Sequence, residues 1–154
     1  NSSSKSFNMT GWRIGWITHP KFLEEHIAKL VQISTTGVPE FLQAGFFSAL
    51  INYKSIVKDV RDGLKKSRDF VFKQTKDWKK IQIPKTESSF YSFFRVKGVK
   101  DSLEYAKLLI DKTQVGLAPG IAFGKSGEGH LRLCFASDLV HLKKILNRLK
   151  NEFA

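Results

Sequence analysis

Arg132 lies in a stretch whose alternation of residue types is typical of a β-strand with one buried face. The stretch is HLRLCFA, residues 130–136. In a strand, Leu131, Leu133 and Phe135 share one face, and Arg132 lies on the other with His130, Cys134 and Ala136. The planar guanidinium of arginine can bind a carboxylate through two parallel hydrogen bonds. From this stretch alone, both a carboxylate-binding arginine and the commoner solvated arginine of a half-exposed strand stay open.

A second stretch of interest is SSKSFNMTGWRIG, residues 3–15, which carries one lysine and, eight residues later, one arginine. A secretory signal would need an apolar run of about 7–15 residues and a cleavage site, and the stretch contains neither. The stretch is not of low complexity, because Phe7, Met9, Trp12 and Ile14 lie within it. It therefore has the composition of the interior of a folded domain.

Residues 2–15 resemble the lysine signature of class I and II pyridoxal-phosphate aminotransferases of fold type I. The lysine, the methionine, the Gly-Trp-Arg triplet and the final glycine all fall in register. The resemblance implies that Lys5 is the catalytic residue and binds pyridoxal 5'-phosphate covalently. It also implies that Arg13 binds the cofactor phosphate and that Ser2 adds a hydrogen bond to it. Ser3 departs from the aromatic or aliphatic residue usual in the family, which affects packing and no catalytic role.

The C-terminal stretch extends the resemblance. VGLAPGIAFG followed by GEGHLRLCFA is similar to the small-domain segment of the same family. In that family an arginine of this segment binds the α-carboxylate of the substrate, which implies this role for Arg132. The resemblance covers only the C-terminal part of such an enzyme. The aspartate, asparagine and tyrosine around the cofactor, and the aromatic residue stacked on its ring, precede the lysine in the family.

The resemblance implies an aminotransferase of amino acid metabolism, which transfers an amino group from an amino acid to a 2-oxo acid. We expect the chain to be inactive without the N-terminal part of the same enzyme, and we expect a homodimer. Two alternatives stay open: an inert truncated segment or pseudo-enzyme, and a fold type I lyase or decarboxylase. The loop STTGVP has no arginine for a second substrate carboxylate, which disfavours a dicarboxylate-specific enzyme.

Composition indicates an ordinary globular chain. It has 154 residues with a net charge of +12, from 26 Lys and Arg against 14 Asp and Glu. The lysines are spread along the chain, so we expect a solvated surface and no nucleic-acid or membrane partner. The single Cys134 excludes an internal disulfide and a cysteine zinc site, which suits the cytoplasm. The four histidines have no metal-ligand spacing, so we expect no metal.

The expected fold class is α/β to α+β. Residues 1–79 are expected to form the end of the large cofactor-binding domain with a long connecting helix, and residues 80–154 a small α+β domain. We expect strands at 12–17, 90–96, 114–117 and 130–136, and helices at 21–32, 40–53, 55–78, 101–111 and 138–153.

The helix expected at 40–53 is apolar on nearly every side. A helix of this kind is normally buried all round, and a chain of this length has little mass to surround it. We therefore expect Phe41, Phe46 and Phe47 to be exposed here and covered by a partner in the complete protein.

Overall fold

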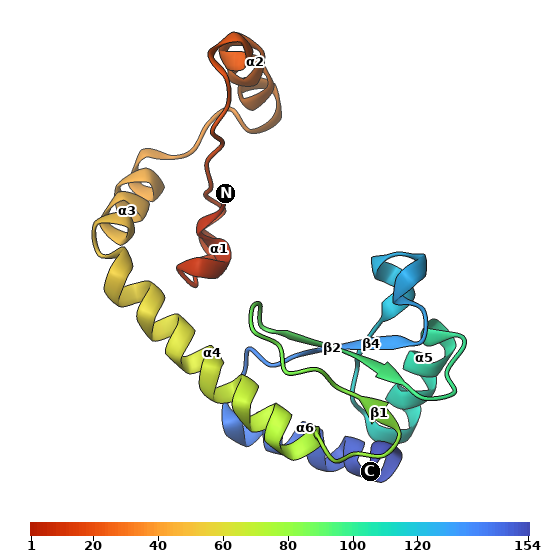
Figure 1. Ribbon diagram of the computed structural model, residues 1–154. Helices are drawn as coiled ribbons and strands as arrows, with labels where there is room; N and C mark the ends of the chain where they lie inside the picture. The colour runs from red at the N-terminus through yellow and green to blue at the C-terminus, as the bar shows by residue number, and fades with distance from the viewer. The chain divides into compact units, whose positions relative to one another are not determined.

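The computed structural model describes residues 1–154, which divide into two compact units, Asn1–Asp62 and Gly63–Ala154 (Figure 1). The division falls inside helix α4 (Tyr53–Thr75). The reason is packing: Ser67, Val71 and Thr75, in the second half of α4, are buried. No helix in the structure is both long enough and apolar enough to cross a membrane.

The first unit is helical. Its elements are α1 (Ser3–Ser6), the 3-10 turns η1 (Thr10–Trp12) and η2 (Lys21–Leu23), α2 (Glu24–Thr35), α3 (Glu40–Ile51) and the start of α4. The helices expected at 21–32 and 40–53 are confirmed in η2, α2 and α3. The strand expected at 12–17 is wrong. Only a single bridge, between Ser2 and Gly15, forms there, because Arg13 adopts a left-handed backbone conformation with φ of 50°.

The core of the first unit is small and surrounds Phe46. Met9, Ile14 and Phe46 are its buried members. The rings of Phe7 and Trp16 lie 5.5 Å from that of Phe46. The expected exposure of Phe41 and Phe47 is confirmed, at 71% and 64%, but it is wrong for Phe46, at 7%. Phe46 is buried because the N-terminal segment packs against its side of α3.

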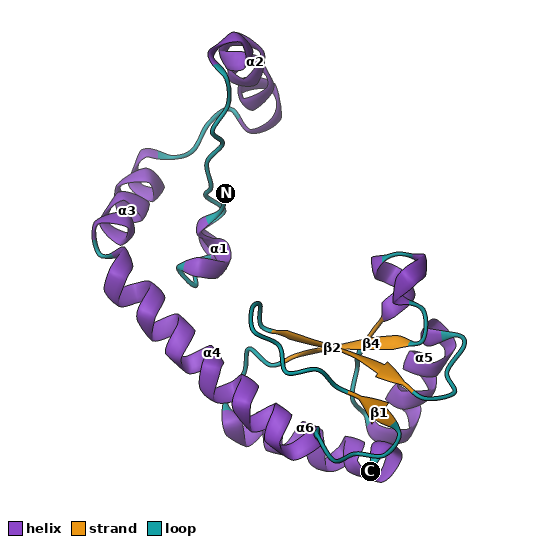
Figure 2. Cartoon of the chain, viewed as in Figure 1, coloured by secondary structure: helices purple, strands orange, loops and turns teal.

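The second unit is a four-stranded antiparallel sheet with helices (Figure 2). After the rest of α4 come β1 (Ile81–Gln82), β2 (Tyr91–Val96), α5 (Ser102–Thr113), β3 (Ala118–Pro119), the 3-10 turns η3 (Gly120–Phe123) and η4 (Lys125–Gly127), β4 (His130–Cys134) and α6 (Leu139–Phe153). The strand order is β1-β2-β4-β3. Of the expected elements, only the strand at 114–117 is displaced, to β3, because Gln114 caps α5 with φ of 57°.

The sheet has one covered face and one open face. Phe94 pairs with Leu131 and Ser92 with Leu133, and these side chains are buried in the core. The covering side chains come largely from α5 and α6, which begin at the N-caps Asp101 and Asp138. The alternate residues of β2 and β4 lie on the open face, and these are Tyr91, Phe93, Arg95, His130, Arg132 and Cys134. The predicted face of Arg132, opposite Leu131 and Leu133, is thereby confirmed.

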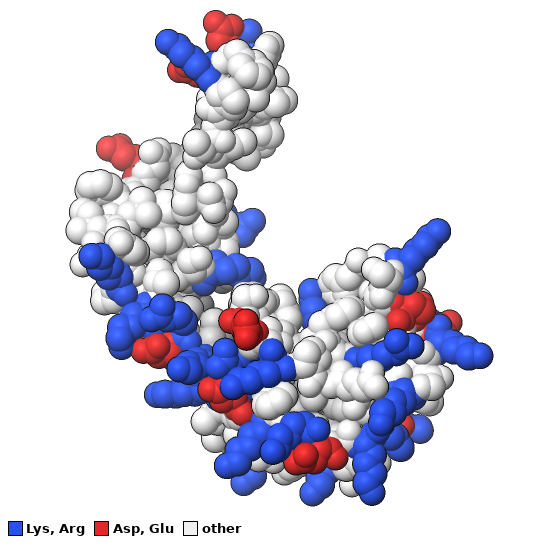
Figure 3. All heavy atoms as spheres, in the orientation of Figure 1, with Lys and Arg blue, Asp and Glu red and all other residues white.

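Charged side chains are dispersed over the surface. In the view of Figure 3, Lys and Arg side chains of the second unit are spread over several elements, with Asp and Glu side chains among them. Such mixing is what a solvated surface of a basic chain shows.

Candidate functional site

The N-terminal segment of the first unit folds back on itself. The backbone nitrogen of Asn1 donates to the carbonyl of Trp16 at 2.7 Å, and the Trp16 N–H donates to the carbonyl of Asn1 at 2.9 Å. The backbone N–H and the hydroxyl of Ser3 both donate to the carbonyl of Ile14, at 3.1 and 2.8 Å. Residues 1–3 and 14–16 are therefore joined, and residues 4–13 form a closed loop between them.

Gly15 makes this closure possible. A Cβ built on Gly15 would lie 2.5 Å from the carbonyl oxygen of Asn1 and 3.3 Å from the Cα of Ser2. Real Cβ atoms do not approach backbone atoms so closely, so any other residue would push the two ends of the loop apart. The close approach of residues 1 and 2 therefore explains why the signature ends in a glycine in this chain.

Ser2, Lys5 and Arg13 are brought to this one loop. Ser2 caps α1, accepting from the Ser4 N–H at 3.1 Å and donating to the Ser4 hydroxyl at 2.9 Å. Lys5 lies within α1 and is exposed. Arg13 is also exposed; one of its terminal N–H groups donates to the carbonyl of Thr10 at 3.2 Å. Left-handed backbone at a non-glycine residue is a strained conformation of the kind that gathers at functional sites.

The donor set of this loop fits pyridoxal phosphate. A phosphate needs cationic and hydroxyl donors, and an aldehyde needs an amine that can bond to its carbon. Arg13 uses one of its five N–H donors on Thr10 and lies within 4.0 Å of no carboxylate, so donors remain for a phosphate. Ser2 would supply a hydroxyl donor by turning its O–H from the Ser4 hydroxyl to the phosphate, and Lys5 would supply the amine. The residues present would hold the group.

Arg132, in the second unit, is half-buried on the open face of the sheet. The carbon at the centre of its guanidinium lies 4.1 Å from the centre of the Tyr91 ring and 4.2 Å from that of the Phe123 ring, over both rings. No carboxylate lies within 4.0 Å of its guanidinium nitrogens. The cation is thus held by aromatic rings and keeps its hydrogen-bonding capacity for a ligand.

The loop that carries Phe123 is fixed by backbone contact. A Cβ on Gly120 would overlap the carbonyl oxygen of Gly127, and a Cβ on Gly127 would overlap that of Gly120. The Ile121 N–H donates to the hydroxyl of Ser102 at 3.1 Å. η3 and η4 therefore lie against each other with no room for side chains between them.

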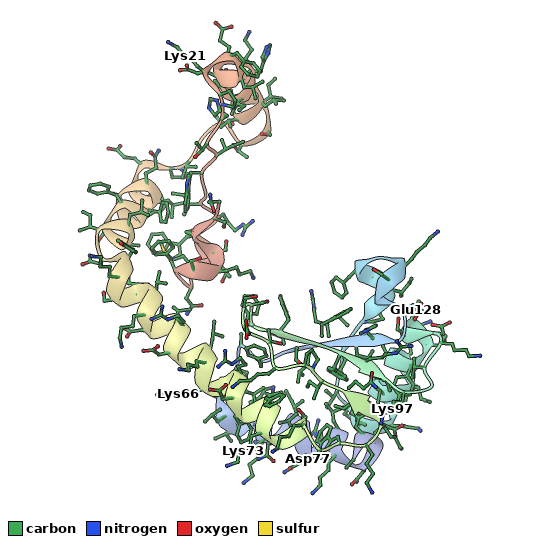
Figure 4. All side chains as sticks on the ribbon, in the orientation of Figure 1. Lys21, Lys66, Lys73, Asp77, Lys97 and Glu128 are labelled. Carbon is green, nitrogen blue, oxygen red and sulfur yellow. The ribbon has the colours of Figure 1, made fainter.

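Glu128 ties the same loop to the start of α5 (Figure 4). Its carboxylate accepts from the Ser102 N–H at 2.6 Å and from the Gly129 N–H at 3.0 Å. Hydrogen bonds from the Ser102 side chain, the Gly129 N–H and the Ser102 N–H hold the pKa of Glu128 below its ordinary value. The charged carboxylate is therefore the form that fastens the loop.

Sequence reasoning missed the two rings on Arg132 and the anchor at Glu128. Tyr91 could have been found from strand pairing, because Arg132 pairs with Phe93 and Tyr91 is its diagonal neighbour on the same face. Phe123 gives no such signal, since the path of a glycine-rich loop is not periodic. No group of three or more His, Cys, Asp and Glu side chains in the structure could hold a metal ion.

A family model described as aminotransferase class I and II matches residues 1–149. The chain is 31% identical to an aspartate aminotransferase of Pyrococcus horikoshii, over 97% of this chain and 39% of the relative. It is 32% identical to an LL-diaminopimelate aminotransferase of Natranaerobius thermophilus, over 100% of this chain and 40% of the relative.

Solved structures are similar over nearly the whole chain. The crystal structure of an aromatic aminotransferase from Pyrococcus horikoshii has a TM-score of 0.91 at 29% identity, covering 99% of this chain and 41% of that one. An aspartate aminotransferase from Thermotoga maritima has a TM-score of 0.84 at 28% identity, covering 99% and 38%. The chain thus spans about 40% of the length of the relatives that it matches.

Proposed function

Because the chain belongs to the class I and II aminotransferase family, we propose that the protein that carries it transfers an amino group from an amino acid to a 2-oxo acid with pyridoxal 5'-phosphate. The observation that carries the proposal is the closed N-terminal loop, which gathers an amine, a guanidinium and a hydroxyl at the positions of the family signature. The pyridoxal phosphate, when bound, supplies a conjugated ring that stabilises negative charge developing at the substrate α-carbon.

Lys5 has two tasks in this proposal. Its Nζ would hold the cofactor covalently, through the carbon of the cofactor aldehyde. The same Nζ would take the proton from the substrate α-carbon as a general base and return a proton later as a general acid. Lys5 lies on α1 and is exposed.

Arg13 and Ser2 bind the phosphate. The guanidinium offers charge-assisted hydrogen bonds, each worth roughly 1.5–3 kcal/mol, and the Ser2 hydroxyl would add one more on turning its O–H from Ser4 to the phosphate. The backbone closure by Gly15 holds both residues in the same loop as Lys5. These contacts would hold the cofactor by its phosphate, independently of the bond to Lys5.

Arg132 binds the α-carboxylate of the substrate. Its two parallel N–H groups match the two carboxylate oxygens, which fixes the orientation of the amino acid about its α-carbon. The relatives are named for aspartate, LL-diaminopimelate and aromatic amino acids. What these share is an α-amino group next to an α-carboxylate, and this is the substrate class that we propose.

We further propose the assembly and setting expected from the sequence. Residues 1–79 are the end of the large cofactor-binding domain with its connecting helix, and residues 80–154 are the small domain. The protein works as a homodimer together with the N-terminal part of the enzyme, which the exposed Phe41 and Phe47 support. A single cysteine, free in the structure, suits the cytoplasm.

The test measures amino transfer by the full gene product, with a panel of amino acids and 2-oxoglutarate as the acceptor. We expect one glutamate formed per amino acid consumed, and a loss of at least a thousandfold in Lys5→Ala. Lys21→Ala, which removes an exposed lysine at the start of η2, is the matched control and should retain activity. Release of ammonia or carbon dioxide without glutamate would instead indicate a lyase or decarboxylase. Full activity in Lys5→Ala would overturn the proposal.

A further inference from the structure

Two rings from different elements converge on one cation. Tyr91 comes from β2 and Phe123 from η3, and both ring centres lie within 4.2 Å of the Arg132 guanidinium carbon. Only about one energetically significant cation–π contact is usual per 70–80 residues of protein. Two on one side chain, with no carboxylate in reach, is an arrangement that calls for a specific reason.

Aromatic rings and a carboxylate bind different parts of a guanidinium. A guanidinium is planar: its faces suit aromatic rings, and its edge carries the N–H donors. Both ring centres lie within 4.2 Å of the central carbon, so the rings restrict where the guanidinium can lie while its N–H groups form no salt bridge. A carboxylate that approaches in the guanidinium plane can form two parallel hydrogen bonds with these groups.

The backbone of the loop that carries Phe123 is held in place, although the Phe123 side chain is 48% exposed. Its loop is held by the backbone contact of Gly120 with Gly127 and by the bond from Ile121 to Ser102. A further ring, Phe93, packs edge-on against Phe123 with 6.0 Å between centres. Phe93 in turn stacks on His130 at 5.0 Å with planes 2° apart. Phe123 therefore reaches Arg132 as part of an aromatic layer and not as a loose side chain.

We propose that Tyr91 and Phe123 are positioning residues that clamp Arg132, so that its N–H edge is oriented for the substrate carboxylate before the substrate arrives. The proposal rests on the carboxylate-binding role of Arg132 in the proposed function. An unclamped arginine would lose rotamer freedom on binding, which weakens affinity. When the rings hold Arg132, its side chain loses that rotamer freedom during folding instead of during binding. The ring contacts offset this entropic cost in the folded protein.

The experiment uses the cofactor-loaded full gene product and two probes that do not react. These are 3-phenylpropanoate and 3-phenylpropanamide, which share a skeleton and differ in the carboxylate. Dissociation constants are measured by calorimetry for the wild type, Phe123→Leu, Tyr91→Leu, Arg132→Lys and the ring-retaining variants Phe123→Tyr and Tyr91→Phe. Ile121→Ala is the matched control, because it shortens an apolar side chain of the same turn and keeps the backbone bond to Ser102.

We expect each leucine variant to raise the dissociation constant of the carboxylate about three- to tenfold, from the strength of one cation–π contact. The amide should change less than twofold, and the ring-retaining variants and the control should stay within twofold of the wild type. In turnover, KM for the amino acid should rise with kcat nearly unchanged. A purely structural role of the rings would not separate carboxylate from amide.

Three results would overturn the clamp. Unchanged carboxylate binding in both leucine variants, with weakened binding in Arg132→Lys, would refute the clamp and leave the proposed function standing. Equal losses for carboxylate and amide would mean that the rings contact the ligand directly. Unchanged binding in Arg132→Lys would refute the clamp together with the carboxylate role on which it rests.

Discussion

Replacing Arg132 by lysine keeps the positive charge and removes the planar fork. Lysine is a point charge with three rotating N–H donors, so it cannot make two parallel bonds in one plane with a carboxylate. The ring contacts of Tyr91 and Phe123 can persist, because an ammonium also binds aromatic faces. The substitution therefore isolates the loss of two-pronged geometry from the loss of charge.

The magnitude follows from one hydrogen bond. Losing one of two charge-assisted bonds costs about 1.5–3 kcal/mol, and about 1.4 kcal/mol corresponds to a factor of ten. We therefore expect Arg132→Lys to lower kcat/KM for the amino acid by at least about tenfold. Cofactor binding should be unchanged, because Ser2, Lys5 and Arg13 belong to the first unit and Arg132 to the second.

The assay combines steady-state kinetics with a cofactor titration of the same preparation. A fall in kcat/KM with an unchanged cofactor affinity supports the assignment. Unchanged kcat/KM would refute the assignment. Arg132 would then be a solvated side chain of a half-exposed strand, with no role in binding the substrate. Loss of cofactor affinity would mean that the substitution disturbs more than the carboxylate contact.

Three further substitutions test the supports of the two sites. Gly15→Ala places a Cβ 2.5 Å from the Asn1 carbonyl oxygen, so the loop must open. The cofactor affinity, measured by dialysis and absorbance, should then fall at least about tenfold. Unchanged affinity would contradict the role of the loop closure. Gly120→Ala forces the backbones of Gly120 and Gly127 apart and should cost about 1–3 kcal/mol in urea unfolding; an unaffected midpoint would contradict the close approach. Glu128 has a lowered pKa, so it stabilises the fold above its ordinary value of 4.5 and loses this effect as pH falls through the lowered pKa. Glu128→Gln should therefore be less stable than the wild type near neutral pH, and the difference in thermal unfolding should close in acid; a difference that grows in acid would contradict the sign.

The spacing of apolar residues along the sequence predicted the helix at residues 40–53 and the strand face on which Arg132 lies. The alternation in residues 130–136 placed Arg132 opposite Leu131 and Leu133, and the structure has it there. The apolar composition of residues 40–53 predicted a helix with exposed phenylalanines, which holds for Phe41 and Phe47.

What the sequence did not predict depends on contacts between distant segments. Phe46 is buried by the folded-back N-terminal segment, whose path is set by the pairing of Asn1 with Trp16 and by the left-handed Arg13. Phe123 reaches Arg132 through a non-periodic loop whose shape depends on Gly120 meeting Gly127. The roles of Ser2, Lys5 and Arg13 came from a family resemblance, since no periodicity assigns chemistry to an exposed amine.

The central claim, that Lys5 carries the cofactor, is tested most directly by chemical trapping. The full gene product is loaded with pyridoxal phosphate, reduced with borohydride so that the covalent bond becomes permanent, digested and mapped by mass spectrometry. We expect the cofactor mass on the peptide that contains Lys5, and no such mass on that peptide in Lys5→Ala. Stoichiometric label on any other lysine, with Lys5 unmodified, would contradict it.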